Sequence, residues 1–205
     1  KRRVLVVQAT GELLLAAVKD AMEQGLVEPV LIGPKSEITA KASIVGLDLS
    51  ACEMVDHSGS DEEAVAKAVD LLKTGAVHFV MKGQVKTATY LRGLLSSKAG
   101  IKAAEKVTHV ALAQAPYYHK IFGGTDGGVI RQPSFEDKVV IADNGIKLLR
   151  LLGYERPKVG CLCYSEVHDP NDPETNDAHK LTELADKGRF GAVDLFGPLG
   201  YDMMF

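Results

Sequence analysis

A short apolar run near the middle of the chain ends in a lysine and a glycine. The run 77–81 has the length of a buried strand, and Lys82 and Gly83 follow it directly. Apolar residues then recur with helical spacing through the segment 90–95. This pattern predicts a strand, a turn and a helix, and the carboxyl end of such a strand is where open α/β sheets bind their ligands.

The groups placed at this strand end suit an anion. A lysine supplies positive charge, a glycine lets the backbone approach a ligand, and the first N–H groups of a helix are free to donate. Hydroxyl groups follow at Thr87 and Thr89, and Arg92 carries a guanidinium that can bind phosphate or carboxylate through paired hydrogen bonds. The alternative is a glycine required by the turn, with the lysine and the arginine simply exposed to solvent.

A second candidate is the glycine-rich segment 123–128, which contains Thr125 and Asp126. Glycines on both sides allow the chain to bend tightly around the carboxylate. Asp126 could orient a cation such as Arg92 or accept a proton, and the alternative is an ordinary glycine turn with an exposed carboxylate. No register of strand, GxGxxG and helix fits this segment, so it is not a dinucleotide-binding fingerprint.

The composition argues against several kinds of partner. Of the 205 residues, 46% are hydrophobic and 25% are charged, and the formal net charge is −3. An ordinary composition without excess positive charge predicts neither nucleic acid nor a membrane surface as partner. The sequence shows no apolar run long enough to cross a membrane and no pattern typical of a signal peptide, so we expect a cytoplasmic protein.

The thiols and imidazoles show no spacing typical of a metal site. The three cysteines, Cys52, Cys161 and Cys163, have apolar neighbours, and their odd number does not favour a disulfide framework. His168 and His179 have no third ligand at a suitable spacing. We therefore expect reduced, non-catalytic thiols, surface histidines and no metal.

Apolar runs of strand length alternate along the chain with helical segments of about a dozen residues. The alternation predicts a three-layer α/β/α sandwich with a largely parallel sheet. Helices are predicted to begin at hydroxyl caps: Ser60, Ser134 and Thr175. Gly153 and Pro157 break the pattern, so we predict a first domain over residues 1–153 and a second over residues 154–205.

The residues around the lysine–glycine pair resemble the phosphate acetyl/butyryltransferase family, and most closely its butyryltransferase branch. The resemblance rests on these residues: Met81-Lys82-Gly83, Thr87-Ala88 and Tyr90-Leu91-Arg92-x-x-Leu95. Similar segments occur along nearly the whole chain, at 25–33, 108–111, 186–188 and 197–199. The resemblance implies an architecture of two lobes like that of the isocitrate and isopropylmalate dehydrogenases.

The reaction implied by the resemblance moves a short acyl group: acyl-CoA + phosphate ⇌ acyl phosphate + CoA. Coenzyme A is then a substrate, and no cofactor is implied. The resemblance points to Arg92 and Asp126 as catalytic residues. It implies that the following residues bind substrate or phosphate: Lys82, Gly83, Thr87, Thr125 and Glu166. Glu166 is expected on a second wall of the cleft, in a motif where Asp169 replaces the asparagine of the butyryltransferase branch.

The family extends beyond the part that this sequence matches. Past the segment resembling 197–199 it carries a Ser-Arg pair and an acidic residue implicated in catalysis, and no residue here matches them. The second domain is expected to be incomplete relative to the family, with little or no turnover by these residues alone and with exposed apolar surface that favours a homodimer. Two other classes stay open: a non-catalytic relative that binds an acyl phosphate, coenzyme A or a protein partner, and a metal- and nucleotide-dependent dehydrogenase of the same architecture.

Overall fold

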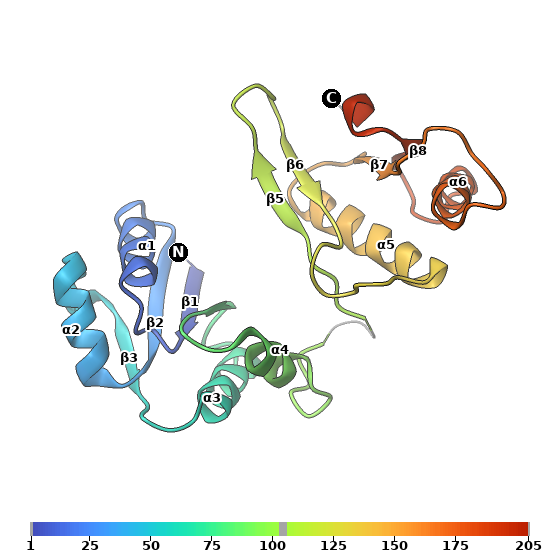
Figure 1. The fold of residues 1–205 in the computed structure, drawn as a ribbon. Coiled ribbons are helices and arrows are strands. Elements are labelled where there is room, and N and C mark those ends of the chain that lie inside the picture. Colours follow the sequence, from blue (N-terminus) through green and yellow to red (C-terminus); the bar gives the residue numbers. More distant parts are fainter. Residues whose placement is uncertain (1, 103–105, 205) are drawn as a thin grey trace. The chain divides into compact units, whose positions relative to one another are not determined.

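The computed structural model describes residues 2–102 and 106–204. The chain divides into two compact units, Lys1–Glu105 and Lys106–Phe205 (Figure 1). The elements of the first unit are β1 (Arg2–Val7), α1 (Glu12–Glu23), β2 (Val27–Gly33), α2 (Lys35–Val45), a 3₁₀ turn (Leu49–Ala51), β3 (Glu53–Asp56), α3 (Asp61–Lys73), β4 (Phe79–Lys82) and α4 (Thr87–Leu95). Its four strands are parallel and lie in the order β3-β2-β1-β4.

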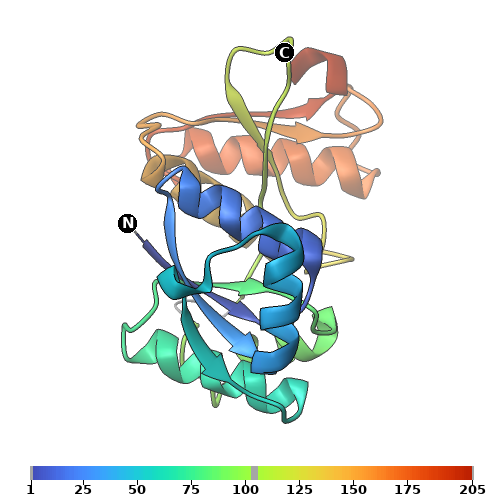
Figure 2. The ribbon, with the colours of Figure 1, turned by 90° about the vertical axis from the view of Figure 1, so that its left-hand side faces the viewer.

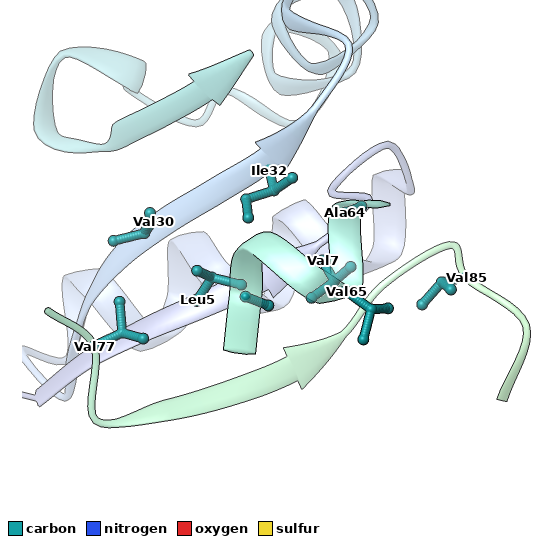
Figure 3. Packing of buried hydrophobic residues seen from close by; sticks show 9 residues of the cluster. Leu5, Val7, Val30, Ile32, Ala64, Val65, Val77 and Val85 are labelled. Atoms are coloured by element: carbon teal, nitrogen blue, oxygen red, sulfur yellow. The ribbon is translucent and has the colours of Figure 1, made fainter. Parts of the chain in front are cut away.

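The inner strands β1 and β2 are apolar on both faces, because helices cover both. Leu5 and Val7 of β1 and Ile32 of β2 face one core, where they pack with Ala64 and Val65 of α3 (Figure 3). The residues between them face the opposite core, which α1 and α2 close: Val6, Leu31, Leu15, Val18, Ile38 and Ala42. Figures 1 and 2 show α1 and α2 on one face of the sheet and α3 and α4 on the other. The predicted three-layer arrangement is confirmed for this unit.

The second unit contains a hairpin and a separate parallel strand pair. Its elements are β5 (Ala111–Gln114), β6 (Ile121–Gly124), α5 (Phe135–Leu151), β7 (Lys158–Leu162), α6 (Pro173–Asp186), β8 (Asp194–Leu199) and a 3₁₀ turn (Tyr201–Met204). β5 pairs with β6 in antiparallel orientation, and β7 pairs with β8 in parallel. The mixed α/β class with mainly parallel pairing agrees with the sequence prediction.

The core of the second unit joins segments on both sides of the predicted domain boundary. Ile146 of α5 is fully buried and packs with Leu181 of α6 and with Phe190 and Leu195. Because α5 shares its core with α6 and β8, it belongs to the unit that begins at Lys106. The compact units therefore divide earlier in the chain than Gly153, where the sequence predicts a boundary.

Two of the three predicted helix caps are confirmed. Ser60 and Ser134 each form a capping box, in which the side chain accepts the N3 backbone N–H and the N3 carboxylate accepts the backbone N–H of the cap. The prediction for Thr175 is wrong. Asp172 caps α6. Asp172 Oδ2 accepts two hydrogen bonds from Thr175, one from the backbone N–H at 2.9 Å and one from the hydroxyl at 2.7 Å. Pro173 follows the cap at the start of the helix, where a missing N–H costs nothing.

In the part of the chain that the structure describes, no helix combines the length and the apolar character needed to cross a membrane.

Candidate functional site

The strand order of the first unit creates a switch point between β1 and β4. The chain passes from β1 outward through β2 to β3 and then returns to place β4 on the other side of β1. The connections that leave β1 and β4 consequently go to opposite faces, with α1 on one face and α4 on the other. Ligands of open α/β sheets bind at the carboxyl ends of the strands at such a point. Lys82 and Gly83 lie there, at the end of β4.

Gly83 holds the end of β4 close to the end of β1. Its N–H donates to the carbonyl oxygen of Val7 at 2.9 Å, and the N–H of Gln84 donates to that of Gln8 at 2.9 Å. A Cβ on Gly83 would overlap both of these carbonyl oxygens. The N–H of Gly83 is therefore occupied, which corrects its expected role as a donor to an anion. The glycine is required because the two backbones approach closely here.

The first turn of α4 offers free N–H groups to a ligand. Its N-cap residue, Lys86, makes no capping hydrogen bond through its side chain, and the first N–H groups of a helix have no partner within the helix. Thr87 begins α4 and is exposed. Lys82 is also exposed, and its Nζ lies 3.4 Å from the carbonyl oxygen of Gly83. A cation, a hydroxyl group and backbone donors thus occur together around the loop 83–86.

Arg92 lies in the last turn of α4 and is exposed. Its neighbours on the helix face the protein: Tyr90 donates its hydroxyl to the carbonyl oxygen of Val80 at 3.0 Å, and Leu94 packs against the core. Arg92 itself makes no hydrogen bond or ion pair with any residue that the structure describes. Its guanidinium is therefore available to an anionic ligand.

The connection from β1 to α1 belongs to the same edge, although its residues were not predicted as site residues. Gly11 is the N-cap of α1 and provides no side-chain cap, so a second helix begins there with free N–H groups. A Cβ on Gly11 would overlap the side-chain amide of Gln84, which shows how close the two loops are. Gln8 donates from Nε2 to Asp61 Oδ1 at 2.9 Å, while its Oε1 is buried without a partner in the described residues. Only the strand order brings these loops together.

Asp126 lies in the second unit and organises its own loop. Its Oδ1 accepts the backbone N–H groups of Gly128, at 2.8 Å, and Val129, at 2.9 Å, and its Oδ2 accepts that of Ile130 at 3.2 Å. Thr125 donates its hydroxyl to the carbonyl oxygen of His109 at 2.6 Å. The bonds of Asp126 agree with the glycine-turn alternative, although its side chain is half-buried and not exposed. Since Arg92 is in the other unit, its orientation by Asp126 stays a prediction.

We expect the loop 126–130 to lose order in acid. Partial burial raises the pKa of Asp126, but the backbone N–H bonds to its carboxylate outweigh this and bring the pKa below its ordinary value of 3.8. A carboxyl group whose pKa is lowered on folding stabilises the folded loop at pH values above its ordinary pKa. This stabilisation is lost as the pH falls through the pKa of the folded state. The amide NMR shifts of Gly128 and Val129 should therefore titrate below 3.8. Asp126→Asn should abolish the titration, and a midpoint above 3.8 would contradict the assignment.

Glu166 lies in the connection from β7 to α6 and is exposed. A Cβ on Gly200 would lie 2.8 Å from Glu166 Oε1, so the carboxylate is close to the end of β8. In the same connection, His168 stacks on His179 with ring centroids 4.0 Å apart. Among the described residues no group of three or more His, Cys, Asp and Glu side chains is arranged to hold a metal ion.

Comparison with known proteins decides the family. The family model described as "Phosphate acetyl/butaryl transferase" matches residues 60–205. The chain belongs to this family. It is 34% identical over 202 residues to the phosphate butyryltransferase of Clostridium acetobutylicum, a match that covers 98% of this chain and 67% of the relative. It is 31% identical over 192 residues to the phosphate acetyltransferase of Rickettsia felis, covering 93% of this chain and 54% of the relative. The chain thus spans between about half and two thirds of the relatives' length.

Two solved structures show the same fold. A branched-chain phosphotransacylase from Enterococcus faecalis V583 has a TM-score of 0.83 at 22% identity, with coverage of 98% of this chain and 70% of the other. A phosphotransacetylase from Streptococcus pyogenes has a TM-score of 0.73 at 18% identity, with coverage of 100% and 70%. The predicted membership of the phosphate acetyl/butyryltransferase family is confirmed. The comparison with the isocitrate and isopropylmalate dehydrogenases stays a prediction.

Proposed function

We propose that this member of the phosphate acetyl/butyryltransferase family moves a short acyl group between coenzyme A and phosphate. The observation that supports this best is the exposed Arg92, which pairs with no described residue and lies on α4, the helix that follows the end of β4 at the switch point. An exposed guanidinium, a lysine and a helix start without a side-chain cap together provide positive charge for a phosphate group. Both substrates, phosphate and acyl-CoA, carry such groups.

In the proposed reaction a phosphate oxygen attacks the thioester carbonyl directly. The new C–O bond gives the acyl phosphate, the C–S bond breaks, and the thiolate of coenzyme A leaves and takes up a proton. Lys82, Arg92 and the first N–H groups of α4 would hold phosphate and offset the negative charge that develops on the carbonyl oxygen. Preorganised donors of this kind are commonly worth a few kcal/mol each. Thr87 would add a hydroxyl donor.

A second candidate is a relative that binds these anions without catalysis. The observation that favours it is the use of both carboxylate oxygens of Asp126 by backbone N–H groups of its own loop. The two candidates share the anion site on the first unit and differ in turnover.

The remaining proposals concern the cofactor, the cellular location and the oligomeric state. We infer that the protein needs no cofactor besides its substrate coenzyme A, and that it is cytoplasmic. We also infer a homodimer. Exposed apolar side chains on the hairpin support it: Leu112 is 44% exposed, Tyr117 101% and Ile121 49%.

The test is release of free coenzyme A from acetyl-CoA and butyryl-CoA with and without inorganic phosphate. The 205-residue chain should be assayed beside a chimera that continues with the last third of the Clostridium acetobutylicum relative. We expect phosphate-dependent release by the chimera and little by the chain alone, because the resemblance implies that the binding and the bond-breaking groups lie on different segments. Release that does not depend on phosphate would contradict the transferase. Phosphate binding to both proteins, with no turnover by the chimera, would favour the binding relative.

A further inference from the structure

Gln8 directly follows the central strand β1 and combines two unfavourable features. Its φ is 54°, and among the described residues, glycines excepted, it alone has a positive φ. A left-handed backbone is unfavourable for a residue that has a Cβ. Gln8 Oε1 is also buried without a hydrogen-bond partner in the part of the chain that the structure describes, and such an oxygen lowers stability. Unfavourable features of this kind persist where a function requires them.

The backbone carbonyl oxygen of Gln8 holds two loops together. It accepts the N–H of Gln84 at 2.9 Å and the N–H of Thr10 at 2.9 Å. Gln84 lies in the loop 83–86, which leads into α4, and Thr10 lies in the connection that leads into α1. Both helices begin without a side-chain cap. Because both loops bond to one oxygen atom, the orientation of this peptide group determines where the loops and the helix starts lie.

The side chain of Gln8 anchors this peptide group to a third segment. Its Nε2 donates to Asp61 Oδ1 at 2.9 Å, and Asp61 is the first residue of α3. Its Oε1 lies beside the end of β2, because a Cβ on Gly33 would be 3.3 Å from it. Gln8 therefore contacts the ends of β1 and β2, the start of α3 and the loop that leads into α4. An anchored side chain keeps the turn ordered before a ligand binds.

We propose that Gln8 is a positioning residue of the anion site at the carboxyl edge of the first unit. It fixes the loop 83–86, so that the first N–H groups of α4 are already ordered when phosphate binds. Gln8 does not touch the ligand itself, and it acts through the loop that its carbonyl oxygen holds. The inference rests on the proposed function, since it requires phosphate to bind at this edge. Arg92 supplies charge to that site, whereas Gln8 supplies order.

Two variants of the full 205-residue chain test this role by calorimetry with inorganic phosphate, beside thermal melting. Gln8→Gly adopts the left-handed conformation without strain and lacks the amide. Gln8→Met keeps a side chain of similar length and removes only the polar groups. Each should weaken phosphate binding by about fivefold or more, because the loop must then become ordered on binding. Neither should lower the melting temperature by more than about 2 °C, since each also removes the unpaired buried oxygen.

Gln24→Met is the matched control, because Gln24 is exposed at the opposite end of α1 from the anion site. It should leave both the affinity and the melting temperature unchanged. Wild-type phosphate affinity in both Gln8 variants would overturn the inference and leave the proposed anion site intact. A larger fall in melting temperature than about 2 °C in both would make Gln8 a structural residue and would also overturn it. No phosphate binding by the unaltered chain would contradict the proposed function, and this inference with it.

Discussion

Gly83→Ala should lower the free energy of unfolding of the first unit by about 3 kcal/mol or more. The added methyl group would overlap the carbonyl oxygens of Val7 and Gln8, which are backbone atoms of the central strand β1 and of the residue that follows it. Neither can move aside without breaking the hydrogen bonds from Gly83 and Gln84 that hold β4 against β1. The melting temperature should fall by about 10 °C or more.

The measurement is urea denaturation, with amide hydrogen exchange of Leu5 and Val7 to report on the first unit. Gly124→Ala is the control, because a Cβ there meets no atom within 4 Å. It should change stability by less than about 0.5 kcal/mol. If both variants were equally stable, the close approach of β4 to β1 would not be the reason for the glycine.

The local elements of this fold could be predicted because each carries its own signal. Ser60 and Ser134 precede acidic residues at the N3 position, and both boxes form. Gly25, with φ of 71°, follows α1 in the left-handed conformation that a glycine adopts without strain. The buried runs at β1 and β2 predict strands covered on both faces, and the alternation of Leu5, Val6 and Val7 between two cores agrees with this.

The strand order could not be predicted, and the anion edge depends on it. Nothing local places the Gln8–Gly11 connection beside Lys82, because the pairing of β1 with β4 joins segments far apart in the sequence. The same pairing brings the backbones of β4 and β1 close together at Gly83. The N–H of Gly83, which was expected to bind a ligand, therefore donates to β1. The antiparallel pairing of β5 with β6 makes the segment between them the loop of a hairpin.

Side-chain competition explains the other differences. Thr175 and Asp172 could both cap α6, and the carboxylate of Asp172 accepts two bonds from Thr175, so it takes the cap. For Asp126, the glycine-rich segment left open whether the carboxylate orients a cation, accepts a proton or lies exposed in an ordinary turn. The same flexible glycines let the backbone fold back so that its N–H groups reach the carboxylate. A sequence pattern shows which groups are present, and the partner that each one finds depends on the folded chain.

Arg92→Ala should weaken the binding of phosphate and of coenzyme A by about tenfold to a hundredfold. Loss of a charge-assisted hydrogen bond costs about 1.5–3 kcal/mol. The fold should be unaffected, because Arg92 is exposed and contacts no described residue by a hydrogen bond or ion pair. Its position near the carboxyl end of α4 contributes only a few tenths of a kcal/mol through the helix dipole. Calorimetry of both ligands, beside thermal melting, measures the two effects separately.

Lys67→Ala provides the comparison that decides whether Arg92 binds the ligand or only adds to the surface charge. Lys67 is exposed on α3, which packs beside α4, so its removal deletes the same charge from the neighbouring helix. If Arg92 contributed only to the overall positive surface charge, both variants would bind phosphate and coenzyme A similarly weakly. Raising the salt concentration would then remove their difference from the wild type. A guanidinium in contact with phosphate predicts a large loss for Arg92→Ala only, and a loss that persists in salt. Wild-type affinity in Arg92→Ala at an unchanged melting temperature would place the anion elsewhere on the protein.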